Sequence, residues 1–152
     1  DNRQDIILLT GDGSIQMNLQ ELQTIIHHRM GIKIFLINNG GYHSIRQTQM
    51  NLFRPPFVGI DSESGVGFPD FEKLSQAFGI SYFCLEKETE CRRGLEQVLN
   101  WDGPCLCQVM VDPKQDFAPK SSSKILPDGQ IVSPSLDDMA PFIEPEVWTS
   151  PV

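Results

Sequence analysis

The chain has 152 residues, of which 39% are hydrophobic and 21% are charged, a length and composition that suit one domain with a buried core. Twenty acidic residues against twelve basic ones give a net charge of −8, which disfavours nucleic acid or an anionic membrane as the main partner. No apolar run approaches the roughly 20 residues that span a bilayer, so no membrane segment is expected.

The beginning of the chain and its cysteines indicate where the protein works. Asp1 is not preceded by Met, and the charged-then-apolar plan of a secretion signal is absent, so we expect a piece of a longer, cytoplasmic protein. Four cysteines without a Cys-x-x-Cys pair predict free thiols and no zinc site. Cys105 and Cys107 flank one residue of a predicted strand, so both should pack on the same face.

The first elements are predicted to be a strand, a helix and a second strand. Residues 5–10 hold a continuous apolar run of the kind that suits a strand buried on both faces of a parallel sheet. Apolar positions at helical spacing predict a helix over 18–29, with Gly31 as its stop, and residues 33–38 repeat the buried-strand pattern. This order is a βαβ unit, whose crossover is nearly always right-handed.

The alternation continues to about residue 112. Asp70 and Thr89 are predicted helix caps, and Gly79 is a predicted helix end. The expected order is a helix over 43–53, a loop over 57–69, a helix over 70–78, a strand over 81–85, a helix over 89–99 and a strand over 104–111.

The predicted fold class is therefore α/β, a parallel sheet with flanking helices, followed by an extended tail. Residues 1–112 make the α/β part. Prolines recur throughout residues 113–152, which predicts an extended Pro-rich C-terminal segment that packs on the domain.

Two polar motifs follow the first two predicted strands: Gly11-Asp12-Gly13-Ser14 and Asn38-Asn39. Ligands of open parallel sheets bind at the carboxyl ends of the strands, where both motifs fall. The oxygens of Asp12 and Asn39 are hard donors that suit Mg²⁺ or Ca²⁺. Gly13 and Ser14 can bring backbone N–H groups to a phosphate. Gly41 permits an unusual backbone angle that would turn its carbonyl toward the same metal. The pattern predicts a metal-bridged diphosphate site.

Each motif alone is most often a tight turn without a ligand. Their conjunction carries the signal, because each follows a predicted strand and 24 residues, including a predicted helix, separate Gly13 from Asn38. This spacing resembles the cofactor signature of the thiamine diphosphate-dependent enzymes. Residues 11–22 are similar to the acetolactate synthase branch. Residues 38–49 resemble acetolactate synthase-like members outside branched-chain biosynthesis, and the resemblance covers about residues 5–145.

The resemblance implies specific roles for this site. Residues 1–112 would be the second half of a domain that binds thiamine diphosphate and Mg²⁺, and the metal ligands would be Asp12, Asn39 and the Gly41 carbonyl. The cofactor contacts would be Gly11, Asp12, Gly13, Ser14, Asn39, Gly41, Tyr42, His43 and Ile45. The Glu that activates the cofactor would lie outside this chain, which alone should be inactive. The complete enzyme would be a homodimer or homotetramer acting on a small 2-keto acid.

The reaction outcome is predicted from two positions. The pyruvate decarboxylase branch usually has an acidic residue where this chain has Ile45, and acetolactate synthase usually has Trp where this chain has Thr48. We therefore expect decarboxylation with carbon–carbon bond formation, or a hydrolase-like relative, with a different acceptor. His43 is interpreted first as a surface turn residue and second as part of the cofactor edge. Arg46 could reach a substrate carboxylate or only solvent.

Two other classes of function remain open. A non-catalytic metal- or nucleotide-binding α/β module would need no missing half. An NAD-type domain is the third class, although the Gly-x-Gly-x-x-Gly motif is absent.

Overall fold

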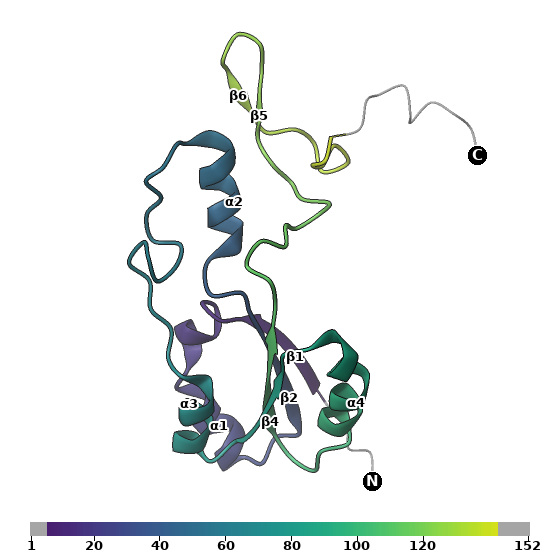
Figure 1. Cartoon of the computed structure of the whole chain (residues 1–152). Coiled ribbons are helices and arrows are strands. Elements are labelled where there is room, and N and C mark those ends of the chain that lie inside the picture. The colour runs from purple at the N-terminus through teal and green to yellow at the C-terminus, as the bar shows by residue number, and fades with distance from the viewer. Residues whose placement is uncertain (1–5, 143–152) are drawn as a thin grey trace, which may run out of the picture.

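A four-stranded parallel sheet forms the centre of the computed structural model, which describes residues 6–142 (Figure 1). Its strands are β1 (Ile6–Gly11), β2 (Ile32–Asn38), β3 (Ser81–Leu85) and β4 (Cys105–Met110), in the order β1-β2-β4-β3. All three neighbouring pairs are parallel. The predicted α/β fold class is confirmed.

Helices cover both faces of this sheet. The helices are α1 (Glu21–His27), α2 (His43–Leu52), α3 (Phe71–Phe78) and α4 (Glu88–Leu99), with a 3₁₀ turn, η1, over Ile15–Asn18. One core layer lies under η1, α1 and α3, and it contains Ile15, Leu22, Ile25, Ile34, Leu36, Phe71, Ile80 and Leu106. The other lies under α4, and it contains Phe35, Leu85, Val98, Cys105 and Cys107. The prediction that Cys105 and Cys107 pack on one face is thus confirmed.

The first strand differs from the prediction that both its faces are buried. Four consecutive side chains of β1, from Ile6 to Leu9, are between 42% and 70% exposed. The reason is position, because β1 is an edge strand that pairs only with β2 within the described residues. Its apolar run nevertheless has the composition of a strand covered on both sides.

Helix boundaries also differ where the chain offers no capping side chain. The single helix predicted over 18–29 is instead η1 followed by α1, and Gln20 at the start of α1 makes no side-chain cap. Thr89 is not a cap either, because α4 starts one residue earlier, after the extended backbone of Lys87. At α3 the predictions hold. The Asp70 carboxylate accepts from two backbone N–H groups of the first turn, and Gly79 ends the helix with φ 71°.

A buried lysine closes the amino-terminal end of the sheet. Lys33 on β2 is 1% exposed, and its Nζ donates to the carbonyls of Trp101 and Gly103 in the turn after α4. The distance to the Gly103 oxygen is 2.7 Å. Lys33 therefore holds the turn between α4 and β4 against the start of β2, a central strand of the sheet.

The Pro-rich segment contains a short hairpin that the prediction of an extended tail omitted. Strands β5 (Lys124–Ile125) and β6 (Ile131–Val132) pair antiparallel and lie away from the sheet in Figure 1. Before the hairpin, Lys120 Nζ donates to the carbonyl of Ser44 and to Gln47 Oε1, so this part of the segment lies against α2. The domain boundary at residue 112 remains a prediction. No helix of residues 6–142 is long and apolar enough to cross a membrane.

Candidate functional site

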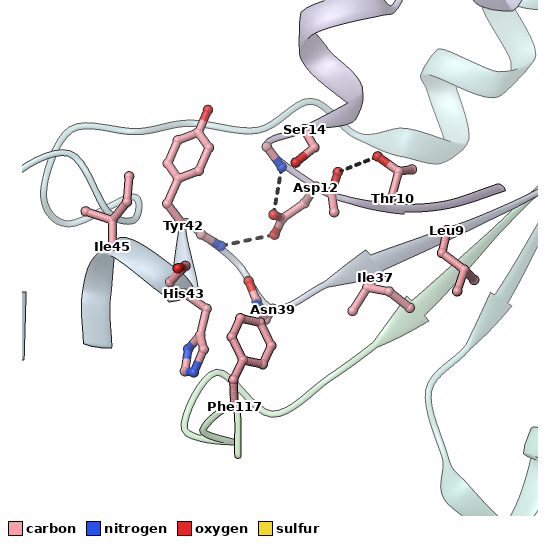
Figure 2. Close-up of a pocket in the computed structure, with 14 residues that line it drawn as sticks. Leu9, Thr10, Asp12, Ser14, Ile37, Asn39, Tyr42, His43, Ile45 and Phe117 are labelled. Atoms are coloured by element: carbon pink, nitrogen blue, oxygen red, sulfur yellow. Dashed lines mark hydrogen bonds between the residues drawn. The ribbon is translucent and has the colours of Figure 1, made fainter. Parts of the chain in front are cut away.

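A cleft of about 420 Å³ opens at the carboxyl ends of β1 and β2 (Figure 2). The lining residues come from the last residues of these strands, from the turns after them, from the start of α2 and from the Pro-rich segment. They are Leu9, Thr10, Gly11, Asp12, Gly13, Ser14, Ile37, Asn39, Gly41, Tyr42, His43, Ser44, Ile45 and Phe117. All nine residues predicted for the cofactor site are among them, so the structure brings the whole predicted set to one cavity.

The carboxylate of Asp12 joins the two turns. Asp12 is 3% exposed, and its Oδ1 accepts from the Gly13 backbone N–H at 2.7 Å. Its Oδ2 accepts from the Gly41 N–H at 3.0 Å, as Figure 2 shows. Two N–H groups hold the negative charge in a fixed orientation, and lone pairs remain on both oxygens. The Gly13 N–H is therefore engaged by Asp12 in this structure.

Gly13 allows the two turns to approach closely. A Cβ placed on Gly13 would lie 2.3 Å from Cε1 of Tyr42, well inside van der Waals contact. The Tyr42 ring in turn packs edge-on against Phe68. A larger residue at position 13 would push the first turn and the Tyr42 ring apart.

Gly41 is a glycine for a different reason from the one predicted. The positive φ in this turn belongs to Gly40, at 69°, whereas Gly41 is not among the glycines with positive φ. A Cβ on Gly41 would instead lie 2.1 Å from the carbonyl oxygen of Ile60. The Gly41 carbonyl accepts from the His43 N–H at 3.1 Å across Tyr42, whose φ of −82° and ψ of 77° are those of an inverse γ-turn.

The loop after α2 supports this turn from behind. The Tyr42 N–H donates to the Ile60 carbonyl at 2.8 Å, and Ile60 is 2% exposed. The next residue, Asp61, accepts from the Ser64 hydroxyl at 2.7 Å, and this bond is the main cause that lowers the pKa of Asp61. Arg46 approaches Asp61 at 3.4 Å and donates to the Pro113 carbonyl at 3.0 Å. Its guanidinium thus points neither to solvent nor into the cleft, which corrects both interpretations of Arg46.

Three buried side-chain atoms of residues 6–142 have no hydrogen-bond partner, and all three belong to the cleft. They are Oδ1 of Asn39 and the two ring nitrogens of His43. Because buried polar atoms are normally paired, each of these atoms is free to accept or donate a bond to a bound group. An amide oxygen beside the Asp12 carboxylate is a donor pair that suits Mg²⁺, so the residues present fit this metal. No group of three or more His, Cys, Asp or Glu side chains in the described part of the chain could hold a metal by itself. The remaining ligands of a cation here would come from backbone, water or the bound molecule.

His43 and Phe117 lie together beyond Asn39, whereas Ile45 lines the cleft from the other side of α2 and is 47% exposed. His43 is 4% exposed, so its interpretation as a surface turn residue is wrong. Its ring packs edge-on against Phe117 with 4.9 Å between ring centroids. Sequence reasoning missed Phe117 as a site residue, although it belongs to the segment of the tail covered by the family resemblance. Its place in the cleft depends on a contact between residues more than 70 positions apart.

Comparison with known proteins gives a consistent result. Residues 1–109 match the family described as "Thiamine pyrophosphate enzyme, C-terminal TPP binding domain". The chain is 33% identical over 114 residues to the acetolactate synthase large subunit of Pyropia yezoensis, a match that covers 75% of this chain and 19% of that protein. It is 34% identical over 126 residues to the corresponding subunit of Cyanidium caldarium, covering 80% of this chain and 21% of that protein.

A bacterial relative shows the same coverage. The chain is 32% identical over 114 residues to the acetolactate synthase isozyme 2 large subunit of Escherichia coli (strain K12), covering 75% of this chain and 20% of that protein. The chain therefore spans about a fifth of the length of these curated relatives.

Proposed function

Because this chain belongs to the thiamine pyrophosphate enzymes, as their C-terminal TPP-binding domain, we propose that its cleft holds the Mg²⁺ and the diphosphate of thiamine diphosphate. The observation that carries the proposal is a pair of metal-ligand oxygens, from Asp12 and Asn39, at the carboxyl ends of β1 and β2. The Asp12 carboxylate is fixed by two backbone N–H groups, and the buried Asn39 amide oxygen has no other partner.

Asp12 and Asn39 would bind the metal together with the Gly41 carbonyl. The cation would offset both the Asp12 charge and the phosphate charges, which matters in a chain with a net charge of −8. Gly11, Gly13 and Ser14 would contact the diphosphate, although the Gly13 N–H is held by Asp12 and would not be the group that donates to it. Tyr42 would hold the first turn in place through its packing over Gly13.

The complete protein would be an acetolactate synthase-like enzyme that acts on 2-keto acids. When bound, thiamine diphosphate supplies a nucleophilic ring carbon and an electron sink for decarboxylation. The residues of this chain would orient the cofactor and shape the wall on which the substrate rests. Ile45 places an apolar side chain without a proton donor at that wall, which favours carbon–carbon bond formation over release of an aldehyde.

We also propose an oligomeric state and a cellular location for the complete protein, both as expected from the family. A homodimer or homotetramer would bring a partner domain with the activating Glu to this cleft, in the cytoplasm. Membership of the family favours this enzyme over a non-catalytic metal- or nucleotide-binding module and over an NAD-type domain.

The test is calorimetric titration of the complete protein with thiamine diphosphate in the presence of Mg²⁺. Asp12→Ala removes the charged ligand, so Mg²⁺-dependent binding should be lost. Asn39→Ala removes a neutral ligand and should weaken binding less. Asp128→Ala, an exposed Asp in the turn of the β5–β6 hairpin, is the matched control and should bind like the wild type. Unchanged affinity in Asp12→Ala would refute the metal site.

A further inference from the structure

The resemblance places His43 among the cofactor contacts, but the metal and diphosphate contacts proposed above leave its buried imidazole unused. The residue is 4% exposed at the start of α2, and it lines the cleft next to Asn39. Neither ring nitrogen has a hydrogen-bond partner in the described part of the chain. The nearest carboxylate, that of Asp116, lies 3.5 Å from Nε2 and is 71% exposed.

A packing role alone does not account for histidine at this place. The ring contacts Phe117, and Leu or Phe would fill the same volume without burying two polar nitrogens. Neutral imidazole always carries one N–H donor and one acceptor, whichever tautomer is present. A ligand atom in the cleft would satisfy the ring and explain the choice of residue.

Two cationic side chains at this part of α2, those of Arg46 and Lys120, already make other contacts. Arg46 interacts with Asp61 and the Pro113 carbonyl. Lys120 donates to the Ser44 carbonyl and to Gln47. A ligand oxygen that enters between Asn39 and Phe117 therefore meets a buried imidazole that makes no hydrogen bond, and neither of these two cations is available to it.

The surroundings of His43 define the rest of the ligand. Phe117 packs on the His43 ring, and Leu9 and Ile37 lie across from these two side chains in Figure 2, whereas Ile45 lines the cleft from the other side of α2. We propose that His43 binds substrate, donating a hydrogen bond to an oxygen atom of a 2-keto acid whose apolar side chain rests against Phe117. This inference rests on the proposed function, because it presupposes that the cofactor occupies the Asp12 end of the same cleft.

The experiment separates hydrogen bonding from packing at position 43. The complete protein, loaded with thiamine diphosphate and Mg²⁺, is assayed with pyruvate as the probe in the wild type, His43→Leu, His43→Asn and His43→Gln. Leu keeps volume and removes the hydrogen bond, whereas Asn and Gln keep an N–H near the two ring-nitrogen positions. Cofactor affinity and thermal melting are measured for every variant.

We expect KM for pyruvate to rise roughly tenfold in His43→Leu, the loss of about one hydrogen bond. At least one of the amide variants should keep KM within about threefold of the wild type, and the affinity for the cofactor should stay within about twofold. A structural role would instead lower the melting temperature of the polar variants and leave KM of His43→Leu unchanged.

Three results would overturn the proposal: a wild-type KM in His43→Leu, equal losses in all three variants, or a loss of cofactor affinity in His43→Leu. If His43→Leu fails to fold, the two amide variants decide, since both would then have to lose pyruvate binding for the proposal to fail. Failure of the metal site would be recognised separately, because Asp12→Ala would then bind the cofactor normally while the His43 variants still changed KM.

Discussion

Replacing Gly41 by Ala should disrupt the site although Gly41 offers no side chain to it. The new Cβ would lie 2.1 Å from the Ile60 carbonyl oxygen, whereas ordinary contact begins at 3.4 Å, so the two segments must separate by more than 1 Å. That movement would break the 2.8 Å bond from the Tyr42 N–H to the same oxygen. Crowding of this kind costs about 1–3 kcal/mol and the lost bond about 1 kcal/mol, so we expect a loss of about 2–4 kcal/mol.

The effect should extend to cofactor binding because the Gly41 N–H also holds the Asp12 carboxylate. A shift of 1 Å in a positioned group can lower activity about 100-fold, and cofactor affinity should fall in the same direction. Thermal melting and calorimetric titration with thiamine diphosphate and Mg²⁺ measure the two effects. Gly67→Ala is the matched control, since a Cβ there meets nothing within 4 Å and Gly67 has no positive φ. The reasoning is refuted if Gly41→Ala melts and binds like Gly67→Ala.

Three further predictions concern single side chains. Ile45→Glu should divert the complete enzyme from carbon–carbon bond formation toward aldehyde release, measured as product partition by chromatography with and without an acceptor; a wild type that already releases only aldehyde would contradict it. Burial raises the pKa of Cys107 to about 12 from an ordinary value near 9. The thiol of the unfolded chain therefore loses its proton at a lower pH than the thiol of the folded chain. The contribution of this pKa difference to the free energy of unfolding is fully present below pH 9 and should be lost between about pH 9 and 12. The free energy of unfolding, measured with urea, should depend less on pH in Cys107→Ala than in the wild type. An equal pH dependence in both proteins would contradict the raised pKa of Cys107. Lys33→Met should lower stability by about 2–4 kcal/mol, because the carbonyls of Trp101 and Gly103 lose their donor; an unchanged urea midpoint would show that water replaces it.

The sequence predicted the sheet well and the exposure of its strands less well. Both β1 and β2 are apolar runs, yet Ile34 and Leu36 on β2 are fully buried while Leu9 on β1 is 70% exposed. The apolar composition of a strand indicates that it is suited to burial on both faces. Whether it lies at the edge or the centre of the sheet depends on its pairing with distant segments. The same limit applies to helix starts, where Asp70 was predictable from its carboxylate and Lys87 carried no local signal.

The candidate site was predictable where local chemistry determined it. Asp12 and Asn39 follow strands directly, and neighbouring parallel strands must end at the same edge. Three features needed tertiary structure: the contact of Gly41 with Ile60, the burial of His43 and the arrival of Phe117 from the tail. Each depends on the loop over residues 57–66 or on the segment after β4. Neither segment has the helical or strand periodicity from which its conformation could be predicted.

The two hydrogen bonds to Asp12 have a thermodynamic consequence for ligand binding. The bond from the Gly41 N–H fastens the turns after β1 and β2 together when the chain folds, and the bond from the Gly13 N–H orients the carboxylate within its own turn. The conformational entropy of ordering these turns is thus lost during folding and not again on association, which is the advantage of a preorganised receptor. At the proposed metal site, a cation would meet a carboxylate already oriented and partly neutralised by amide dipoles. Its affinity would then depend on how closely the fixed oxygen positions match its radius, and a small ion with strict geometric demands would gain most from such rigidity.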